Sequence, residues 1–258
     1  MKYCLKLLLV FLMTIPASFS VLIFSPFDRE GRIAYKIARV WTWTILKVGG
    51  IRLKVAGLGG LDSSRPYVFI SNHQSNIDIP VLFHSLTGFQ LRWVAKKELI
   101  YVPIFGWAFW ASKHILVNRS SRAKAMASIR EAREKVKGGI SVVFFAEGTR
   151  SSTGKLLPFK RGGFLLAFKT GTPIVPIIIK GSGRILPKGD WRIRNGEIEV
   201  IVGEPIAIDQ SHPRDLSALL NRVRAIMESG LRTPVSSFSR IPSMGANPVG
   251  PEKIVGVK

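Results

Sequence analysis

The chain has 258 residues, of which 47% are hydrophobic and 21% are charged, and this composition excludes a chain that is disordered throughout. With 38 Lys and Arg residues against 16 Asp and Glu residues, the formal charge is +22, which indicates an anionic partner: a phospholipid surface, a nucleic acid or a phosphorylated small molecule. The single cysteine, Cys4, excludes an internal disulfide framework and a cysteine-rich zinc site. The mean hydropathy of +0.22 favours the membrane over nucleic acid.

Residues 1–50 are predicted to form a helical hairpin that anchors the chain to a membrane. Residues 7–24 are an uncharged run of 18 residues, which is at the lower limit for spanning a bilayer. Pro16 lies inside this run, so we expect the helix to bend, or to enter the membrane and return. A signal peptide is the alternative, since two lysines precede the apolar run and small residues lie near its middle.

Residues 33–51 carry apolar side chains at helical spacing, with basic side chains largely on the other side. Together with two tryptophans, this pattern is typical of an amphipathic helix at a membrane surface. The alternative is an ordinary helix packed on a core. Basic residues that follow the first apolar run favour attachment at the cytoplasmic face of a cell inner membrane.

Residues 51–229 are predicted to form an α/β domain, because short β-rich runs alternate with longer helical runs. The expected strands are residues 51–55, 67–71, 91–95, 141–145, 174–179 and 197–202. The expected helices are residues 77–85, 104–113, 122–137, 162–170 and 213–228. Strands separated by helices predict a mostly parallel central sheet that is covered by helices on both faces.

Residues 230–258 contain four Gly, four Pro and four Ser, and no apolar period runs through them, so we expect a disordered tail. Elsewhere the chain contains neither H-E-x-x-H nor C-x-x-C, which argues against a protein-bound zinc site. Residues 148–155 resemble a phosphate-binding P-loop, but five residues separate the two glycines instead of four. Leu156 stands where a Ser or Thr would bind magnesium, so nucleotide hydrolysis is not expected.

The strongest local feature is the sequence Ser-Asn-His-Gln-Ser-Asn-Ile-Asp at residues 71–78, at the end of a predicted strand. On one straight helix, His73 and Asp78 would diverge by about 140°. They can meet if His73 lies in the loop and Asp78 lies in the first helical turn, with Ser75 as the N-cap. Asp78 would then hold one imidazole nitrogen and leave the other as a base. The alternative is structural: Ser75 and Asp78 form only a capping box, and His73 is only a loop residue.

A second polar segment, Ala-Glu-Gly-Thr-Arg at residues 146–150, also follows an apolar strand. Gly148 allows the backbone to approach a ligand closely, and Arg150 offers two parallel donors to a phosphate. The alternative is a surface turn with a solvated ion pair.

Together, Asn72-His73-x4-Asp78 and Glu147-Gly148-Thr149-Arg150 resemble the glycerolipid acyltransferase family, and most closely the 1-acyl-sn-glycerol-3-phosphate acyltransferases. Two further blocks of the family are similar to residues 96–119 and 174–177, where the matching positions are Lys96, Lys97, Glu98, Leu99, Pro103, Gly106, Arg119, Ile174, Val175, Pro176 and Ile177. The four blocks occur in family order. The chain departs from the family pattern at Ala146, where many members have proline, and at Lys113, where glycine is often found.

The resemblance implies transfer of a fatty acyl group from a thioester to the sn-2 hydroxyl of 1-acylglycerol 3-phosphate (lysophosphatidate), which yields phosphatidic acid. His73 would remove the hydroxyl proton, Asp78 would orient the imidazole, and no cysteine or serine nucleophile is needed. The donor would be acyl-CoA or an acyl carrier protein, and no bound cofactor or metal is expected. An apolar tunnel that opens toward the hairpin should hold the acyl chain, with Trp107, Phe109 and Trp110 as candidates for its lining.

For the acceptor phosphate, the resemblance implies Arg150 and Arg119, with Lys97 as a further candidate. Glu147 would orient the acceptor or the arginine, and Gly148 would give room beside Thr149. Lys160 and Arg161 are candidates for the phosphates of the donor or for a solvated helix start.

Two alternatives remain open from the sequence. The first is an acyltransferase for another acceptor: glycerol 3-phosphate, another lysophospholipid or a lyso-ornithine lipid. The second is a basic nucleic-acid-binding module, which the dispersed basic residues and the apolar N-terminal run disfavour. The sequence predicts no oligomeric state.

Overall fold

The computed structural model describes residues 2–118, 120–210 and 216–235 of the chain. A seven-stranded sheet with the strand order β1-β7-β6-β2-β5-β3-β4 forms its centre. The strands are β1 (Ile51–Ala56), β2 (Val68–Ser71), β3 (Leu91–Lys96), β4 (Ile115–Val117), β5 (Ser141–Phe145), β6 (Ile174–Lys180) and β7 (Gly196–Val202). All neighbouring strands run parallel except β6 and β7, so the predicted mostly parallel sheet is confirmed.

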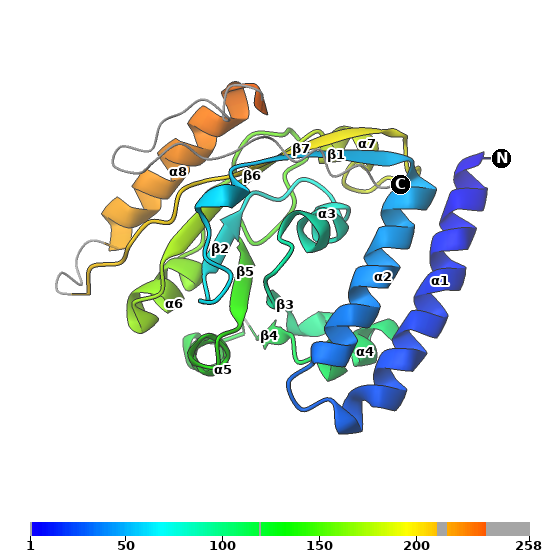
Figure 1. Cartoon of the computed structure of the whole chain (residues 1–258), viewed down its shortest axis with the longest axis horizontal. Helices are drawn as coiled ribbons and strands as arrows, with labels where there is room; N and C mark the ends of the chain where they lie inside the picture. Colours follow the sequence, from blue (N-terminus) through cyan, green and yellow to red (C-terminus); the bar gives the residue numbers. More distant parts are fainter. Residues whose placement is uncertain (1, 119, 211–215, 236–258) are drawn as a thin grey trace.

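Helices cover both faces of the sheet, as predicted (Figure 1). One face packs against α2 (Arg32–Gly49) and α3 (Asp78–Ser85), and the other packs against α5 (Arg122–Lys137), α6 (Gly162–Thr170) and α8 (Leu216–Arg232). The strand β2 and its neighbours β5 and β6 are almost entirely buried, which explains their nearly continuous apolar sequences.

The order of these three strands brings distant parts of the sequence together. β2 lies between β5 and β6, and Ser71 at its end is in register with Phe145 of β5 and Ile177 of β6. Because the three strands are parallel, the loops that follow β2 and β5 leave the same edge of the sheet. The two polar segments found in the sequence therefore meet.

The structure adds short elements that the sequence did not predict: the strand β4, the helix α7 (Ser182–Ile185) and the 3₁₀ helices η1 (Ser25–Phe27), η2 (Leu58–Gly60) and η3 (Lys97–Tyr101). Elements of three to five residues are too short to show a hydrophobic period. The helix α4 (Phe105–Ala111) is shorter than expected, and α8 continues to Arg232, past the boundary predicted at residue 229. Residues 236–258 of the predicted tail lie outside the described residues.

The N-terminal residues form a helical hairpin of α1 (Lys2–Phe24) and α2, which lie side by side (Figure 1). The expectation that the first helix would enter and return at Pro16 is wrong, because α1 continues through this residue and the chain turns back only after Phe24. The side chain of Asp28 then caps α2 by accepting from the backbone N–H groups of Arg32 at 2.7 Å and Ala34 at 2.8 Å.

The hairpin is fixed to the sheet through Arg92 of β3, whose side chain is fully buried. Its guanidinium donates to the backbone carbonyls of Leu91 and Glu30, and the second of these belongs to the turn between the two helices. Burial lowers the pKa of Arg92 to about 10, although Asp28, Tyr35 and Glu30 oppose this shift. The hairpin is therefore part of the same packed body as the sheet.

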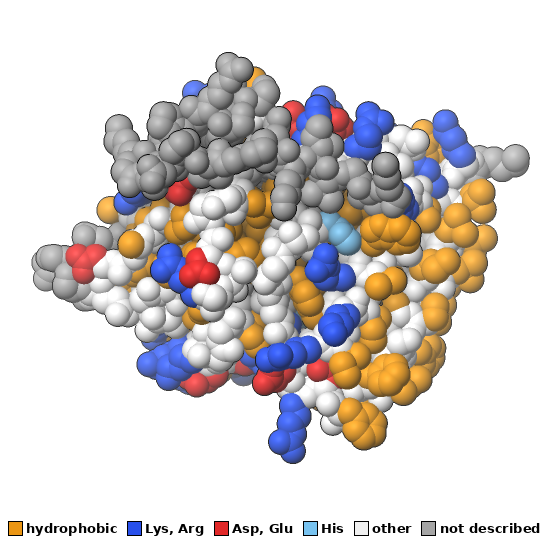
Figure 2. Space-filling model, viewed as in Figure 1, with side chains coloured by type: hydrophobic (Ala, Val, Ile, Leu, Met, Phe, Trp, Pro, Cys, Tyr) orange, Lys and Arg blue, Asp and Glu red, His pale blue; other side chains and the backbone are white. Residues whose placement is uncertain are grey.

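The hairpin leaves much of its apolar surface exposed. In α1 and the turn that follows it, residues Lys2–Phe27 have a mean hydropathy of 2.5 with only 11% of the apolar window buried, so this segment is long and apolar enough to cross a membrane. In α2, Thr42 and Leu46 are buried against the protein, whereas Val40 of the predicted apolar stripe is 65% exposed. Figure 2 shows hydrophobic side chains gathered over α1, α2 and α4.

Candidate active site

The loop after β2 carries His73 and is fixed to the neighbouring strand by Asn72. The side-chain amide of Asn72 donates to the carbonyl of Ile179 at 2.9 Å and accepts from the N–H of the same residue at 2.8 Å. Asn72 is buried, so this paired contact satisfies polar groups that have no access to water. The position of His73 follows from this anchored turn at the end of the strand.

His73 and Asp78 meet as predicted. The Nδ1 atom of His73 lies 2.8 Å from Oδ2 of Asp78, which is fully buried as the first residue of α3. The same oxygen accepts from the backbone N–H groups of Gln74 at 2.8 Å and Ser75 at 2.9 Å. With Nδ1 as the donor to a carboxylate, the Nε2 atom of His73 carries the free lone pair, which is the form that a general base requires.

The capping interpretation and the base-orienting interpretation hold together. Asp78 accepts from the backbone of Ser75, while the Oγ of Ser75 accepts from the N–H of Ile77 at 3.2 Å and donates to the carbonyl of Leu186 at 2.7 Å. The expectation that Ser75 is the N-cap of α3 is wrong, because residues 75–78 first form a turn and Ile77 occupies the cap position.

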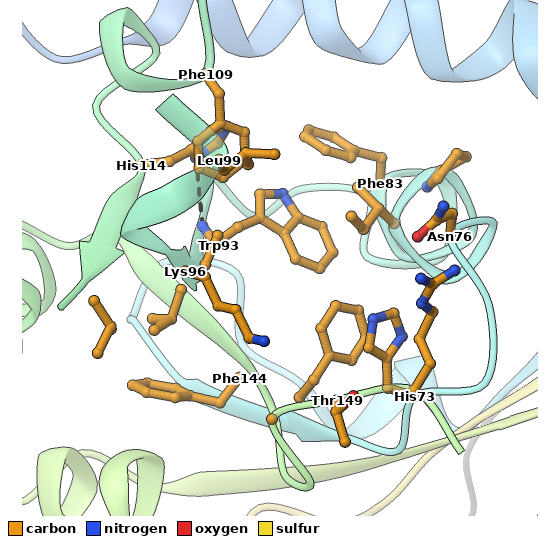
Figure 3. A pocket seen from close by; sticks show the side chains of 18 of the residues that line it. His73, Asn76, Phe83, Trp93, Lys96, Leu99, Phe109, His114, Phe144 and Thr149 are labelled. Carbon is orange, nitrogen blue, oxygen red and sulfur yellow. Dashed lines mark hydrogen bonds between the residues drawn. The ribbon is translucent and has the colours of Figure 1, made fainter. Parts of the chain in front are cut away.

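The imidazole plane is set by an aromatic neighbour that the sequence analysis missed. The ring of His73 stacks on Phe145 with ring centroids 3.7 Å apart and an interplanar angle of 9°, and Phe145 in turn stacks on Trp93 at 5.8 Å. Figure 3 shows His73 and Trp93 at the same cavity. Phe145 is the last residue of β5 and pairs in register with Ser71, so the strand order would have identified it.

Glu147 has a different role from the one that the resemblance implied. Its Oε1 accepts from the backbone N–H of His73 at 3.0 Å, and its Oε2 accepts from the N–H of Leu157 at 2.9 Å. The side chain is buried and does not line the cavity. Burial raises the pKa of Glu147, against the two backbone N–H groups, which lower it. Glu147 thus ties two loops together and leaves contact with a substrate to its neighbours.

The residues after Glu147 do reach the cavity. Gly148 has a φ of +68°, in the left-handed region that favours glycine, and this turn brings Thr149 and the half-buried Arg150 to the cavity wall. The N–H of Ser151 donates to the carbonyl of His73 at 2.8 Å, so Arg150 is held next to the histidine loop.

The other basic candidates separate into three groups. Lys97 is exposed and does not line the cavity, because β3 extends to Lys96 and the chain turns into η3 at Lys97. Lys96 does line the cavity and points into it in Figure 3, although the sequence analysis assigned it no role. Lys160 and Arg161 also line the cavity. Arg119 lies outside the described residues.

The cavity has a volume of about 1330 Å³ and extends from His73 to the N-terminal hairpin. Its apolar end is lined by side chains of α1, α2 and α4, among them Val10, Val21, Trp41, Ile45 and Phe109. Trp107 and Trp110 are not part of the lining and are 51% and 60% exposed, which corrects their predicted place. A long apolar space that ends at a polar base suits a substrate with a fatty chain and an anionic head.

His114 and Lys113 lie at the far side of the cavity, in the β3–β4 connection. The N–H of Trp93 donates to Nδ1 of His114 at 3.4 Å, and burial lowers the pKa of His114 well below its usual value (Figure 3). Lys113 has a φ of +61°, in the region where glycine is favoured, so the lysine at a family glycine position keeps the glycine-like conformation. In the described part of the chain, no group of three or more His, Cys, Asp or Glu side chains is arranged to hold a metal ion.

Comparison with known proteins identifies the family. Residues 52–180 match the family model named Acyltransferase. The chloroplastic 1-acyl-sn-glycerol-3-phosphate acyltransferase of Brassica napus is 38% identical over 183 residues, which are 70% of this chain and 52% of that protein. The enzyme of the same name from Pseudomonas aeruginosa is 34% identical over 212 residues, which are 81% of this chain and 80% of that protein.

Among solved structures, the 1-acyl-sn-glycerophosphate acyltransferase of Thermotoga maritima is similar, with a TM-score of 0.72 and 26% identity over 94% of this chain and 100% of that one. The chain spans only about half the length of the chloroplastic relatives, namely 52% for the one from Brassica napus and 58% for the one from Arabidopsis thaliana. A family model that covers half of the chain and a relative that is matched over 80% of its length agree with the geometry of His73 and Asp78. On this sequence and structural similarity, the chain belongs to the acyltransferase family.

Proposed function

We propose that the chain transfers a fatty acyl group from an acyl thioester to the sn-2 hydroxyl of 1-acylglycerol 3-phosphate and so produces phosphatidic acid. The observation that carries this proposal is the contact of 2.8 Å between His73 and Asp78 at the mouth of a long apolar cavity that also holds Arg150. The relatives and the solved structure described above are named for acylation of the same acceptor.

The proposed reaction is a direct transfer with a histidine base. Nε2 of His73 takes the proton of the acceptor hydroxyl, and the buried carboxylate of Asp78 stabilises the imidazolium that forms. The alkoxide attacks the thioester carbonyl, the tetrahedral intermediate collapses, and the proton passes from His73 to the departing thiolate. A base positioned in this way contributes about 10²- to 10⁴-fold to the rate.

Arg150 is proposed to hold the acceptor phosphate with two parallel donors, because it lines the cavity next to the histidine loop. Lys96 is proposed to assist it in place of Lys97, since Lys96 points into the cavity. Thr149 can donate a hydrogen bond from its hydroxyl, and Arg119 remains a prediction from the resemblance.

The acyl donor is proposed to be acyl-CoA or an acyl carrier protein, without a bound cofactor. Its phosphate groups would meet Lys160 and Arg161, which line the cavity without an ion pair to any described acidic side chain. The fatty chains would lie in the apolar end of the cavity against the hairpin.

The N-terminal hairpin is proposed to attach the protein to a phospholipid membrane, at the cytoplasmic face of a cell inner membrane. The exposed apolar side chains of α1 and the length of this helix support the attachment. The exposed rings of Trp107, Trp110 and Trp191 would suit the headgroup level, where tryptophan is enriched. Because the hairpin also lines the cavity, a lipid could reach His73 directly from the membrane.

The test uses the purified full chain in phospholipid vesicles with 1-acylglycerol 3-phosphate and either acyl-CoA or an acyl carrier protein as donor. Phosphatidic acid is expected as the product, measured by mass spectrometry, and His73→Ala should lower turnover by about 10²- to 10⁴-fold while the protein stays folded. Near-normal turnover by His73→Ala refutes the base.

The same assay decides between acceptors. Glycerol 3-phosphate, other lysophospholipids and a lyso-ornithine lipid are offered separately at equal concentration. Faster turnover of any of them than of 1-acylglycerol 3-phosphate overturns the proposed acceptor, and a phosphate-free acceptor that works equally well overturns the role of Arg150.

A further inference from the structure

Arg224 of α8 grips a loop that belongs to the active site. Its guanidinium donates to the carbonyl of Leu157 at 3.0 Å and to the carbonyl of Leu156 at 3.3 Å, and its Nε donates to Glu228 at 2.8 Å. The guanidinium carbon also lies 5.3 Å from the ring centroid of Phe159. Arg224 lies outside residues 52–180, the part of the chain that matches the family model.

A short series of hydrogen bonds connects this grip with the base. The N–H of Leu157, whose carbonyl Arg224 holds, donates to Oε2 of Glu147 at 2.9 Å. The other oxygen of Glu147 accepts from the N–H of His73 at 3.0 Å. Leu157 is thus held from both sides, by Arg224 at its carbonyl and by Glu147 at its amide.

The loop that Arg224 holds has few other attachments. Residues 152–155 are exposed, so apolar packing does not fix the tip of the loop. The loop connects Arg150 to Lys160, both of which line the cavity, and Lys160 is attached by its N–H to the carbonyl of Ala146 at 2.7 Å. Hydrogen bonds from a charged donor are stronger than those between neutral groups, so Arg224 contributes much of the order in this loop.

We propose that Arg224 is a positioning residue for acyl transfer, which acts through Leu157 and Glu147 on the histidine loop and on the cations of residues 150–161. The proposal rests on the proposed function of the site. α8 itself docks on the sheet through Val223 and Met227, which are fully buried, so the helix does not depend on Arg224 for its place.

The first test compares Arg224→Met and Arg224→Lys with Arg222→Met. Arg222 is an exposed arginine on the same helix and is the matched control. Both Arg224 variants are expected to lower kcat/KM for the acceptor by about tenfold or more, because a small displacement of positioned groups has effects of this size. The lysine variant should retain more activity than the methionine variant, since an ammonium can still donate to one carbonyl. Wild-type kinetics in both Arg224 variants would overturn the proposal.

A double-mutant cycle separates positioning from a general loss of stability. If the effect of Arg224 passes through Glu147, Arg224→Met combined with Glu147→Gln should be little worse than Glu147→Gln alone. Losses that add in full would mean that the two residues act independently, and this outcome also overturns the proposal.

Hydrogen exchange provides a readout that does not depend on activity. Peptides that cover residues 151–161 should exchange faster in Arg224→Met than in wild type and Arg222→Met, whichever acceptor the enzyme uses. An inactive wild-type protein with this exchange difference would refute the proposed function alone. Unchanged exchange in an active protein would refute the role of Arg224 alone.

Discussion

The cavity has two polar regions that are built in opposite ways. In the histidine region (residues 71–78 and 145–147), the buried polar side chains Asn72, Asp78 and Glu147 all bind backbone groups. In the cation region (Lys96, Arg150, Lys160 and Arg161), no side chain forms an ion pair with a described acidic residue. The difference teaches that the fold positions the base before a substrate arrives and leaves the positive charges free for the ligand.

The largest expected effect comes from Asp78 in the histidine region. Asp78→Asn should lower kcat by about 10³- to 10⁴-fold, because an amide no longer fixes the imidazole tautomer or stabilises the imidazolium. Asp62→Asn, at an exposed carboxylate in a loop far along the surface, is the control and should keep wild-type kcat. Only a small loss in Asp78→Asn would show that capping α3 is the main role of Asp78.

Arg150 tests the cation region. Arg150→Met should raise KM for 1-acylglycerol 3-phosphate by about 10- to 100-fold, because a hydrogen bond to a charged group contributes about 1.5–3 kcal/mol. Lys96→Met should have a smaller effect of the same kind. Steady-state kinetics against acceptor concentration measure both values, and a fall in kcat without a change in KM would place Arg150 with the histidine region instead.

Glu147 links the histidine region to pH. Because burial raises its folded pKa above the unfolded value of about 4.3, folding favours the protonated form. The stability that this proton contributes is present at acidic pH and is lost as the pH rises through the folded pKa. The free energy of unfolding of wild type relative to Glu147→Gln should therefore fall from about pH 4 to pH 7, as measured by urea denaturation. A difference that stays constant over this range would contradict a buried, titrating Glu147.

The smallest effect is expected at Lys113, which lies outside both regions. Lys113→Gly should raise the free energy of unfolding by about 0.5–1 kcal/mol, since glycine adopts a positive φ without the strain of a side chain. Lys113→Ala removes the charge but keeps the strain, and it should give no such gain. Thermal denaturation compares the three proteins, and equal gains in both variants would assign the effect to charge.

Local sequence predicted the elements of the histidine region but not all of their contacts. The spacing of His73 and Asp78 already required a loop followed by a helix, and the structure confirms it. The stacking of Phe145 on His73 and the contact of Glu147 with Leu157 were not predicted, because both depend on which strands are neighbours. In the cation region, one residue of difference in the end of β3 exchanged Lys97 for Lys96.

The amino-acid sequence by itself determined the strands, the longer helices, the apolar N-terminal run and the pairing of a histidine with an aspartate five residues later. Hydrophobic period and turn residues act over a few neighbouring positions, so these features can be recognised without knowledge of the rest of the chain. Only the tertiary structure decided that β2 lies between β5 and β6, that Glu147 serves two backbone amides, and that Arg224 reaches the same loop from α8. These contacts join residues that are far apart in sequence, and their geometry exists only once the sheet and its helices have packed.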